Sequence, residues 1–275
     1  MPSLSEALQP FAAVVLTGGS SGIGKSFIRL AGTLSSDLVI CNLSRRPPAE
    51  NIFPGAAKRL NHFYCDLARS SEVERTAAQI QVFLGRTVPT GRILLINNSG
   101  VGAFGAFAAQ DVAKQLALID VNVRALVQLT GLLLPLLRER GGAIMNIAST
   151  VAFQPTPFAA TYGASKAFVL HWSLALNEEL RGTGVRAIAV CPGTTTTDFF
   201  RTAGLDDQAG KTKMSMTTDQ VAEAALRALA AGRAQVVPGW VNKLYTFAGS
   251  KLRKSHAARI AAAVLQGRRP KKDAT

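Results

Sequence analysis

Cysteine and histidine are scarce in this sequence, and their shortage argues against two classes of site. Among 275 residues there are three cysteines and three histidines, with no CxxC or Cys/His spacing. The cysteines are odd in number, and each lies in or at the end of a strand-like apolar run. A disulfide framework or a zinc site is therefore not expected, no metal ligand is assigned, and a reducing, cytoplasmic compartment is indicated. These cysteines are Cys41, Cys65 and Cys191.

A long uninterrupted apolar run is also missing. The chain begins MPSLSEALQP, without a basic segment followed by an apolar one, so a signal peptide is not expected. The most apolar stretch, ALVQLTGLLLPLLRER, is interrupted by Gln128, Thr130 and Pro135. A membrane-spanning helix is therefore not expected either.

Acidic residues are outnumbered by basic ones, 17 to 31, which gives a net charge of +14. This balance leaves nucleic acid, anionic lipid or an anionic cofactor as partners. Ten basic residues and one acid lie from Arg233 onward, so nine of the fourteen net charges belong to the last stretch. We favour a C-terminal helix packed on the domain over an amphipathic helix on an anionic membrane. Nucleic acid ranks third, because no recognition motif accompanies the charge.

Short apolar runs alternate with longer segments of helical period, from AAVVLT near the start to VRAIAVC, which ends at Cys191. Strands that are apolar throughout and separated by helices predict an α/β fold, a doubly wound parallel sheet with helices on both faces. Gly141, Gly182 and Gly184 are placed at helix ends, and Pro157 in the first turn of a helix. We predict a single dinucleotide-binding and catalytic domain over 1–238 and a basic helical extension over 239–275.

A glycine-rich turn follows the first predicted strand, which ends at Thr17. Its sequence is Gly18-Gly19-Ser20-Ser21-Gly22-Ile23-Gly24, and a helical segment comes next. Glycines let the backbone approach a pyrophosphate closely, and the free N–H groups at a helix start bind its negative charge. The turn therefore predicts a dinucleotide site.

One predicted helix carries a tyrosine and a lysine one turn apart. Tyr162 and Lys166 project from the same face of that helix. A free tyrosine, with a pKa near 10, is a poor acid or base at neutral pH, but an adjacent ammonium favours the phenolate. We expect Lys166 to bring the pKa of Tyr162 toward the working range.

Five motifs in order resemble the short-chain dehydrogenase/reductase family over residues 12 to about 198. They are the TGxxxGxG turn; Asn97-Asn98-Ser99-Gly100, where the family has NNAG; Asn122 in the long helix; Ser149 with Tyr162-Gly-Ala-Ser-Lys166; and Pro192-Gly193. The resemblance implies an oxidoreductase that interconverts a carbonyl and a secondary alcohol by hydride transfer. The catalytic residues it implies are Asn122, Ser149, Tyr162 and Lys166.

The same resemblance assigns roles to these residues. Tyr162 is the general acid/base, Ser149 polarises the substrate carbonyl, Lys166 binds the nicotinamide ribose, and Asn122 holds a water that links the lysine to solvent. Asp66-Leu67 lies beside the adenine, and Thr195 and Thr197 bind the carboxamide and pyrophosphate. The implied cofactor-binding residues are Gly18, Ser20, Ser21, Gly22, Ile23, Gly24, Arg45, Asp66, Leu67, Asn98, Ser99, Gly100, Tyr162, Lys166, Pro192, Gly193, Thr195 and Thr197.

The end of the second strand indicates which dinucleotide is bound. A carboxylate is expected there for the 2′-hydroxyl of NAD, but Ser44 is followed by Arg45 and Arg46. A guanidinium can form two hydrogen bonds to a 2′-phosphate. The sequence therefore predicts NADP(H) in preference to NAD(H); the alternative is that both arginines belong to a solvated loop.

The substrate is left open between steroids, fatty acyl groups, sugars and small ketones. Apolar side chains near the motifs predict an apolar pocket beneath a mobile segment, Asp198–Met216. The alternatives are a 3-oxoacyl-thioester reductase and a non-catalytic dinucleotide-sensing or membrane-associated protein. The apolar residues near the motifs are Phe153, Phe158, Phe199, Phe200, Met214 and Met216.

Two helical segments, 111–138 and 158–180, carry more apolar residues than one sheet-facing stripe requires. We therefore expect a homodimer or homotetramer with both segments at the contact. The residues assigned to it are Leu126, Leu129, Leu132, Leu133 and Leu136 on the first segment and Phe168, Leu170, Trp172, Leu174 and Leu176 on the second.

Overall fold

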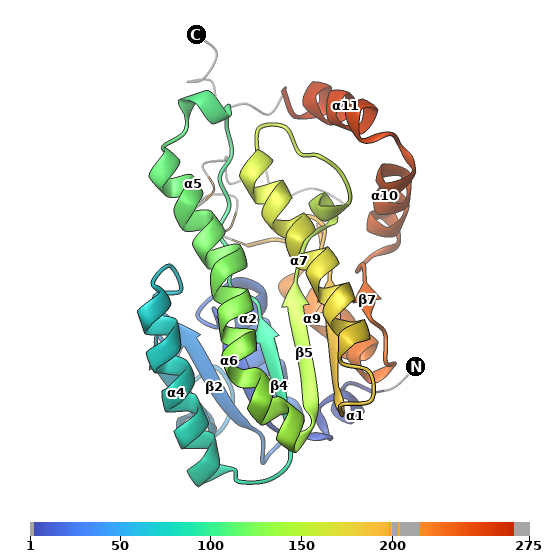
Figure 1. Ribbon diagram of the computed structural model, residues 1–275. Helices are drawn as coiled ribbons and strands as arrows, with labels where there is room; N and C mark the ends of the chain where they lie inside the picture. The colour runs from blue at the N-terminus through green and yellow to red at the C-terminus, as the bar shows by residue number, and fades with distance from the viewer. Residues whose placement is uncertain (1–2, 198, 200–202, 204–214, 267–275) are drawn as a thin grey trace.

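Seven parallel strands form the centre of the molecule in a computed structural model, which describes residues 3–197, 199, 203 and 215–266. The strand order is β3-β2-β1-β4-β5-β6-β7, and every neighbouring pair is parallel. The predicted α/β doubly wound fold is confirmed (Figure 1). The strands are β1 (Phe11–Thr17), β2 (Val39–Ser44), β3 (Leu60–Tyr64), β4 (Arg92–Asn97), β5 (Gly142–Ile147), β6 (Val185–Val190) and β7 (Gln235–Val236).

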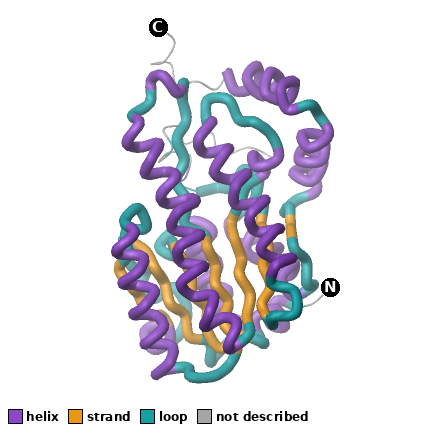
Figure 2. Tube along the Cα trace, viewed as in Figure 1, coloured by secondary structure: helices purple, strands orange, loops and turns teal. Residues whose placement is uncertain are grey.

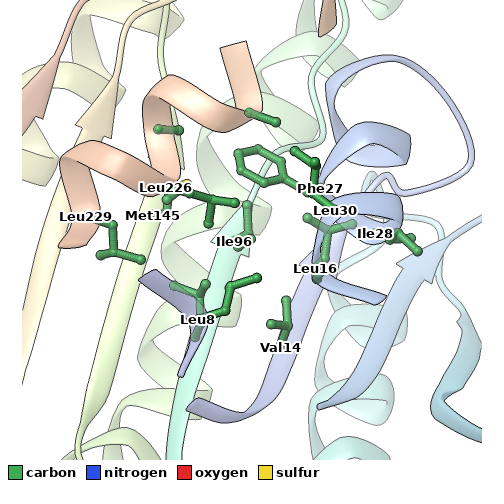
Figure 3. Packing of buried hydrophobic residues seen from close by; sticks show 14 of the residues in the cluster. Leu8, Val14, Leu16, Phe27, Ile28, Leu30, Ile96, Met145, Leu226 and Leu229 are labelled. Atoms are coloured by element: carbon green, nitrogen blue, oxygen red, sulfur yellow. The ribbon is translucent and has the colours of Figure 1, made fainter. Parts of the chain in front are cut away.

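Helices cover both faces of the sheet, which is why the central strands are buried on both sides (Figure 2). One face packs against α1 (Leu4–Leu8), α2 (Gly22–Leu34) and α9 (Thr218–Ala230), and Figure 3 shows Phe27 of α2 and Leu226 of α9 in that core. The other face packs against α4 (Ser70–Thr87), α6 (Ala125–Arg140) and α7 (Ala160–Glu179). The short elements are α3 (Ala56–Arg59), η1 (Phe107–Ala109) and η3 (Thr150–Phe153).

The long segment predicted over 111–138 is continuous but not uniform. It comprises α5 (Val112–Ile119), a π-helical turn η2 (Asp120–Arg124) and α6. By length and composition alone it is the one helix in the described part of the chain that could cross a membrane. Leu129, Leu133 and Leu137 are nevertheless buried against the sheet in the core.

The helix ends follow the predicted glycines but not the predicted proline. Gly141, Gly182 and Gly184 have φ of 72°, 76° and 78°, a left-handed backbone that residues with a Cβ rarely adopt. The prediction for Pro157 is wrong, because α7 begins only at Ala160. Between them Phe158 has φ of 63°, so the chain turns once more before it becomes helical.

The chain ends in two helices, α10 (Trp240–Lys251) and α11 (Lys254–Gln266), beyond the carboxyl edge of the sheet (Figure 1). Lys254 Nζ donates to Phe153 O over 2.8 Å, and Gln154 Nε2 donates to the Tyr245 hydroxyl. These contacts attach the C-terminal helices to η3 and the loop that follows it. The division into 1–238 and 239–275 stays a prediction.

Buried amides connect the two middle strands to the helices of one face. Asn97 Nδ2 donates to Asn146 Oδ1 over 2.8 Å and to Thr130 Oγ1 over 3.0 Å, and Asn146 Nδ2 donates to Ser173 Oγ over 2.9 Å. Asn97 and Asn146 are paired in the register of β4 and β5. Because buried polar groups are costly without partners, this network fixes α6 and α7 relative to the sheet.

We predict that Asn146→Ala lowers the free energy of unfolding by about 2–4 kcal/mol, because it leaves Asn97 and Ser173 each short of a buried partner. Urea unfolding followed by circular dichroism measures the change. Asn51→Ala, at an exposed turn position, is the control and should change stability by no more than about 0.5 kcal/mol. Equal effects of the two substitutions would contradict a stabilising role for the network.

Candidate active site

A cleft of about 1690 Å³ lies at the carboxyl edge of the sheet. Open parallel sheets bind ligands at this edge, where the strand order reverses between β1 and β4. Every site residue predicted from the sequence lines the cleft except Gly24 and Asn122. The structure therefore brings predicted site residues as far apart in the sequence as Gly18 and Thr197 into one cleft.

The glycine-rich turn has the conformation that the motif requires. Gly18 and Gly22 have φ of 74° and 55°, and a Cβ on Gly24 would lie 2.2 Å from Gly18 O. Gly24 thus lets α2 pack closely on the turn, which explains why it does not line the cleft. Ser21 caps α2 without a side-chain hydrogen bond, so its hydroxyl does not occupy the first N–H groups of the helix.

Thr17, which was not singled out from the sequence, joins the ends of β1 and β4. Its Oγ1 accepts the N–H groups of Asn98 and Ser99, both over 3.0 Å, and Asn98 Nδ2 donates to Thr17 O over 2.9 Å. A Cβ on Gly18 would lie 2.6 Å from Ser99 Oγ. The hydroxyl of the unusual Ser99 therefore faces the turn, in a space that only glycine leaves open. In the sequence, only its position immediately before Gly18 could have marked Thr17 as a site residue.

The arginines after β2 lie at the edge of the cleft. Ser44 is buried, accepts from Asn42 Nδ2 and donates to Arg46 O over 2.6 Å. Arg45 and Arg46 are exposed and line the cleft, and within the described residues neither forms an ion pair. Asn42 also accepts the Gly19 N–H over 2.8 Å, which connects this corner to the glycine-rich turn.

Tyr162 and Ser149 meet at the other end of the cleft. Burial raises the pKa of Tyr162 to about 12, and a hydrogen bond with the Ser149 side chain opposes this increase. The prediction that Lys166 lowers the pKa of Tyr162 is wrong for this structure, because desolvation of the phenol outweighs any attraction from the lysine. Tyr162 is therefore a neutral phenol at pH 7.

Lys166 is buried beneath this pair. Its Nζ donates to Ile147 O, at the end of β5, over 2.7 Å. Burial lowers the pKa of Lys166 to about 8. A Cβ on Gly100 would lie 3.2 Å from Lys166 Nζ, so the loop after β4 passes directly over the amine.

Asn122 lies next to Lys166 but is bonded elsewhere. Its Oδ1 accepts from Val101 N, and its Nδ2 donates to Val101 O, each over 2.9 Å, and to Ser165 Oγ over 3.0 Å. The π-helical turn that carries Asn122 is thereby joined to the β4 loop and to α7. The structure gives Asn122 a positioning role; its role in holding a water stays a prediction.

The substrate end of the cleft differs in part from the prediction. The Phe199 ring packs against Tyr162 with centroids 5.3 Å apart, and Gly102 makes room for it, because a Cβ there would lie 2.6 Å from that ring. Phe153, Phe158 and Met216 do not line the cleft. Phe200 and Met214 lie outside the described residues, as does most of the segment Asp198–Met216.

Residues of α10 and α11 complete this end, and the sequence analysis did not anticipate them. The cleft is lined by Val241, Asn242, Tyr245, Ala248, Gly249, Leu252, Ala257, Ile260, Ala261 and Val264. The alternation of small and apolar residues in this segment could have indicated that it packs against a pocket. It does not reveal which helix face meets the cleft. The described residues hold no group of three or more His, Cys, Asp or Glu side chains that could bind a metal.

Comparisons with known proteins agree with this geometry. The family model for short chain dehydrogenases matches residues 12–208. A ketoacyl reductase of Nostoc sp. is 34% identical over 66% of this chain and 62% of its own length. An uncharacterised oxidoreductase of Staphylococcus saprophyticus is 34% identical over 78% of this chain and 89% of its own length.

A solved structure shares the architecture. The short-chain dehydrogenase from Sphingobium yanoikuyae in complex with NADPH is 27% identical, with a TM-score of 0.72 over 89% of this chain and 98% of that one. The sequence resemblance, the fold and the site geometry thus lead to one assignment. The chain belongs to the short chain dehydrogenase family of oxidoreductases, whose substrates carry a CH–OH group or the corresponding carbonyl.

Proposed function

We propose that this protein is an NADP(H)-dependent oxidoreductase that interconverts an apolar carbonyl compound and its secondary alcohol. One observation carries the proposal: Ser149, Tyr162 and Lys166 line the same cleft as a glycine-rich turn and two guanidinium groups that form no ion pair with any described residue.

The residues present suit a dinucleotide. Gly18 and Gly22 leave a cradle that a side chain would fill or strain, and α2 begins there with no side-chain cap. Asp66 and Leu67, which are expected beside the adenine, also line the cleft. The remaining expected contacts line the same cleft as Tyr162; they are Asn98, Ser99, Gly100, Pro192, Gly193, Thr195 and Thr197.

Arg45 and Arg46 support NADP(H) over NAD(H). Among the described residues no carboxylate pairs with these guanidinium groups, and Ser44 occupies the position where an acid would bind a 2′-hydroxyl. A 2′-phosphate could therefore bind them. The complex of the Sphingobium relative with NADPH supports the same choice.

The chemistry of this chain's own residues is proton transfer. When bound, the nicotinamide supplies the hydride in reduction and accepts it in oxidation. Tyr162 holds its proton at neutral pH, because its pKa is about 12, so it is poised to donate it to a carbonyl oxygen. Ser149 donates its one hydroxyl hydrogen to that oxygen, in place of its contact with Tyr162, and so polarises the carbonyl.

Lys166 lies one helical turn from Tyr162, and as an ammonium it stabilises the phenolate electrostatically. Its bond to Ile147 O holds the amine at a fixed place at the end of β5, and the Asn122 bonds hold the adjoining loop over it. Because the ammonium favours negative charge on the tyrosine, it lowers the cost of the proton transfer. At neutral pH these protonation states favour carbonyl reduction.

A 3-oxoacyl-thioester reductase is the second candidate. The Nostoc relative is named a ketoacyl reductase, and the basic residues of the C-terminal region would attract an acidic carrier or a coenzyme A thioester. A panel that pairs simple apolar ketones with 3-oxoacyl thioesters distinguishes the candidates by kcat/KM. Because Cys41, Cys65 and Cys191 are all buried and free, we further propose a reducing, cytoplasmic location.

Tyr162→Phe should lower the reductase turnover by about 10²–10⁴-fold while leaving NADPH affinity nearly unchanged, because only the transferable proton is lost. Steady-state kinetics and NADPH fluorescence titration measure the two effects. Tyr64→Phe, which removes the hydroxyl of an exposed tyrosine in β3, is the matched control. Retention of more than about a tenth of the turnover in the Tyr162 variant would refute the assignment.

The pH profile should show the titration of Lys166. The ammonium is present below its pKa of about 8 and is lost above it, whereas Tyr162, with a pKa of about 12, stays protonated across the same range. We therefore expect kcat/KM for carbonyl reduction to be level below pH 8 and to fall above it. A profile that remains level through pH 10, about two units past that point, would contradict this role for Lys166.

Arg45→Ala should raise the KM for NADPH by roughly 10- to 150-fold and change that for NADH little, since a charge-assisted phosphate contact is worth about 1.5–3 kcal/mol. Arg138→Ala, an exposed arginine at the far end of α6, is the control. Equal effects of Arg45→Ala on both dinucleotides would exclude Arg45 from the phosphate site.

We also propose a homodimer or homotetramer, but its contact differs from the one predicted. Leu126, Leu129, Leu133, Leu170 and Leu176 are buried in this chain's own core, because the helices turn those residues toward the sheet. The exposed apolar side chains of α5, α6 and α7 support the proposal and redefine the contact. They are Val112, Leu116, Ile119, Val127 and Phe168.

Val127→Glu should therefore disperse the oligomer and leave the fold intact, whereas Leu133→Glu should unfold the protein. Light scattering and circular dichroism distinguish these outcomes. A wild-type mass near 29.0 kDa at micromolar concentration would rule out the oligomer.

A further inference from the structure

Helix α10 presents its apolar side to solvent. Trp240, Leu244 and Phe247 are 78%, 62% and 62% exposed, while Thr246 and Gly249 are buried. At 100° per residue the three large side chains form one stripe, and Thr246 and Gly249 lie on the opposite side. A helix that only packs on a domain has the reverse arrangement.

The polar contacts of α10 confirm which side faces inward. Asn242 Nδ2 donates to Pro238 O over 2.7 Å, and a Cβ on Gly193 would lie 2.2 Å from Asn242 Oδ1. A Cβ on Gly249 would lie 2.5 Å from Gln154 Oε1. The small and polar side of α10 is thus fitted against the cleft, so rotation of the helix cannot bury the apolar stripe.

Cations flank the stripe. Lys243 and Lys251 fall within the same arc of the helix, both are exposed, and Lys251 Nζ lies 5.6 Å from the centre of the Phe247 ring. Neither α10 nor α11 contains an acidic residue, and Arg253 and Arg259 add two more exposed positive charges. We call Trp240, Lys243, Leu244, Phe247 and Lys251 the α10 face.

Three occupants could cover the α10 face. The remaining tail, 267–275, is GRRPKKDAT, which has no large apolar side chain to offer. A second copy related by a twofold axis would bring lysines against lysines, with no acid on either helix to compensate. An anionic bilayer suits both the lysines and the apolar stripe of the α10 face. Its phosphates attract the lysines, and its interface accepts Trp, Leu and Phe.

We infer that the α10 face docks this protein on the surface of an anionic phospholipid membrane. The helix lies in the interface plane, with the stripe among the upper acyl chains and Lys243 and Lys251 extended to the headgroups. Because the inner side of α10 lines the cleft through Asn242 and Gly249, docking places the substrate end of the cleft beside the lipid.

The test is sedimentation with sucrose-loaded vesicles of phosphatidylcholine alone or mixed with phosphatidylglycerol. The full chain should sediment with the anionic vesicles and much less with the neutral ones, and the emission of Trp240 should shift to shorter wavelength. The combined Trp240→Ser, Leu244→Ser and Phe247→Ser substitutions should weaken the partition roughly tenfold or more. Lys243→Glu with Lys251→Glu should weaken binding to the anionic vesicles by a similar factor.

Val82→Ser, which removes an exposed apolar side chain from α4, is the control and should bind like the wild type. Thermal unfolding midpoints confirm that each variant is folded. Three results would overturn the inference: no sedimentation with anionic vesicles, undiminished binding of the triple serine variant, or an oligomer that the triple serine variant disperses. The second would assign binding to the basic tail alone, and the third would assign the α10 face to a second copy.

Discussion

Seven strands that run in one direction end at a single edge, and the geometry of the site follows from that constraint. The carboxyl ends of β1, β4 and β5 deliver Thr17, Asn98 and Ile147 to neighbouring positions, although these residues are far apart in the sequence. Side-chain bonds across the ends, from Thr17 to the β4 loop and from Lys166 to β5, then fix the loops that line the cleft. Without the common strand direction these groups would stand at opposite edges.

Burial gives the site its protonation states as well as its shape. The same desolvation raises the pKa of Tyr162 and lowers that of Lys166, because it penalises the charged form of each group. A neutral phenol therefore stands one helical turn from an amine that titrates near pH 8. The buried amides of Asn97 and Asn146 brace α7, so the helix that carries both groups is held against the sheet by polar as well as apolar contacts.

The sequence predicted the fold and the part of the cleft lining that the motifs supply, because both depend on local patterns, but it did not predict the lining that α10 and α11 add. Apolar runs separated by helical segments specify a parallel sheet, and the glycine spacing around Gly18, Gly22 and Gly24 specifies the turn. Three features depended on tertiary structure and were not predicted correctly. The periodicity of α6 does not show which leucines meet the sheet, so Leu133 was assigned to a contact between chains. The π-helical turn at Asn122, whose side chain bonds to Val101 and Ser165, has no signal in the local sequence pattern. The pKa of Tyr162 depends on desolvation that sequence spacing does not reveal.

The proposed function requires that NADPH, when bound in this cleft, would supply hydride to the carbon of a carbonyl group whose oxygen Ser149 and Tyr162 hold. The most direct test uses NADPH deuterated at the transferable position of the nicotinamide, an apolar ketone as substrate, and mass spectrometry of the alcohol formed. With the wild type we expect an alcohol that carries one deuterium on the carbinol carbon. With Tyr162→Phe we expect almost no alcohol over the same time. Alcohol formed by the wild type without deuterium, or no alcohol from any member of a broad ketone panel, would contradict the proposed function.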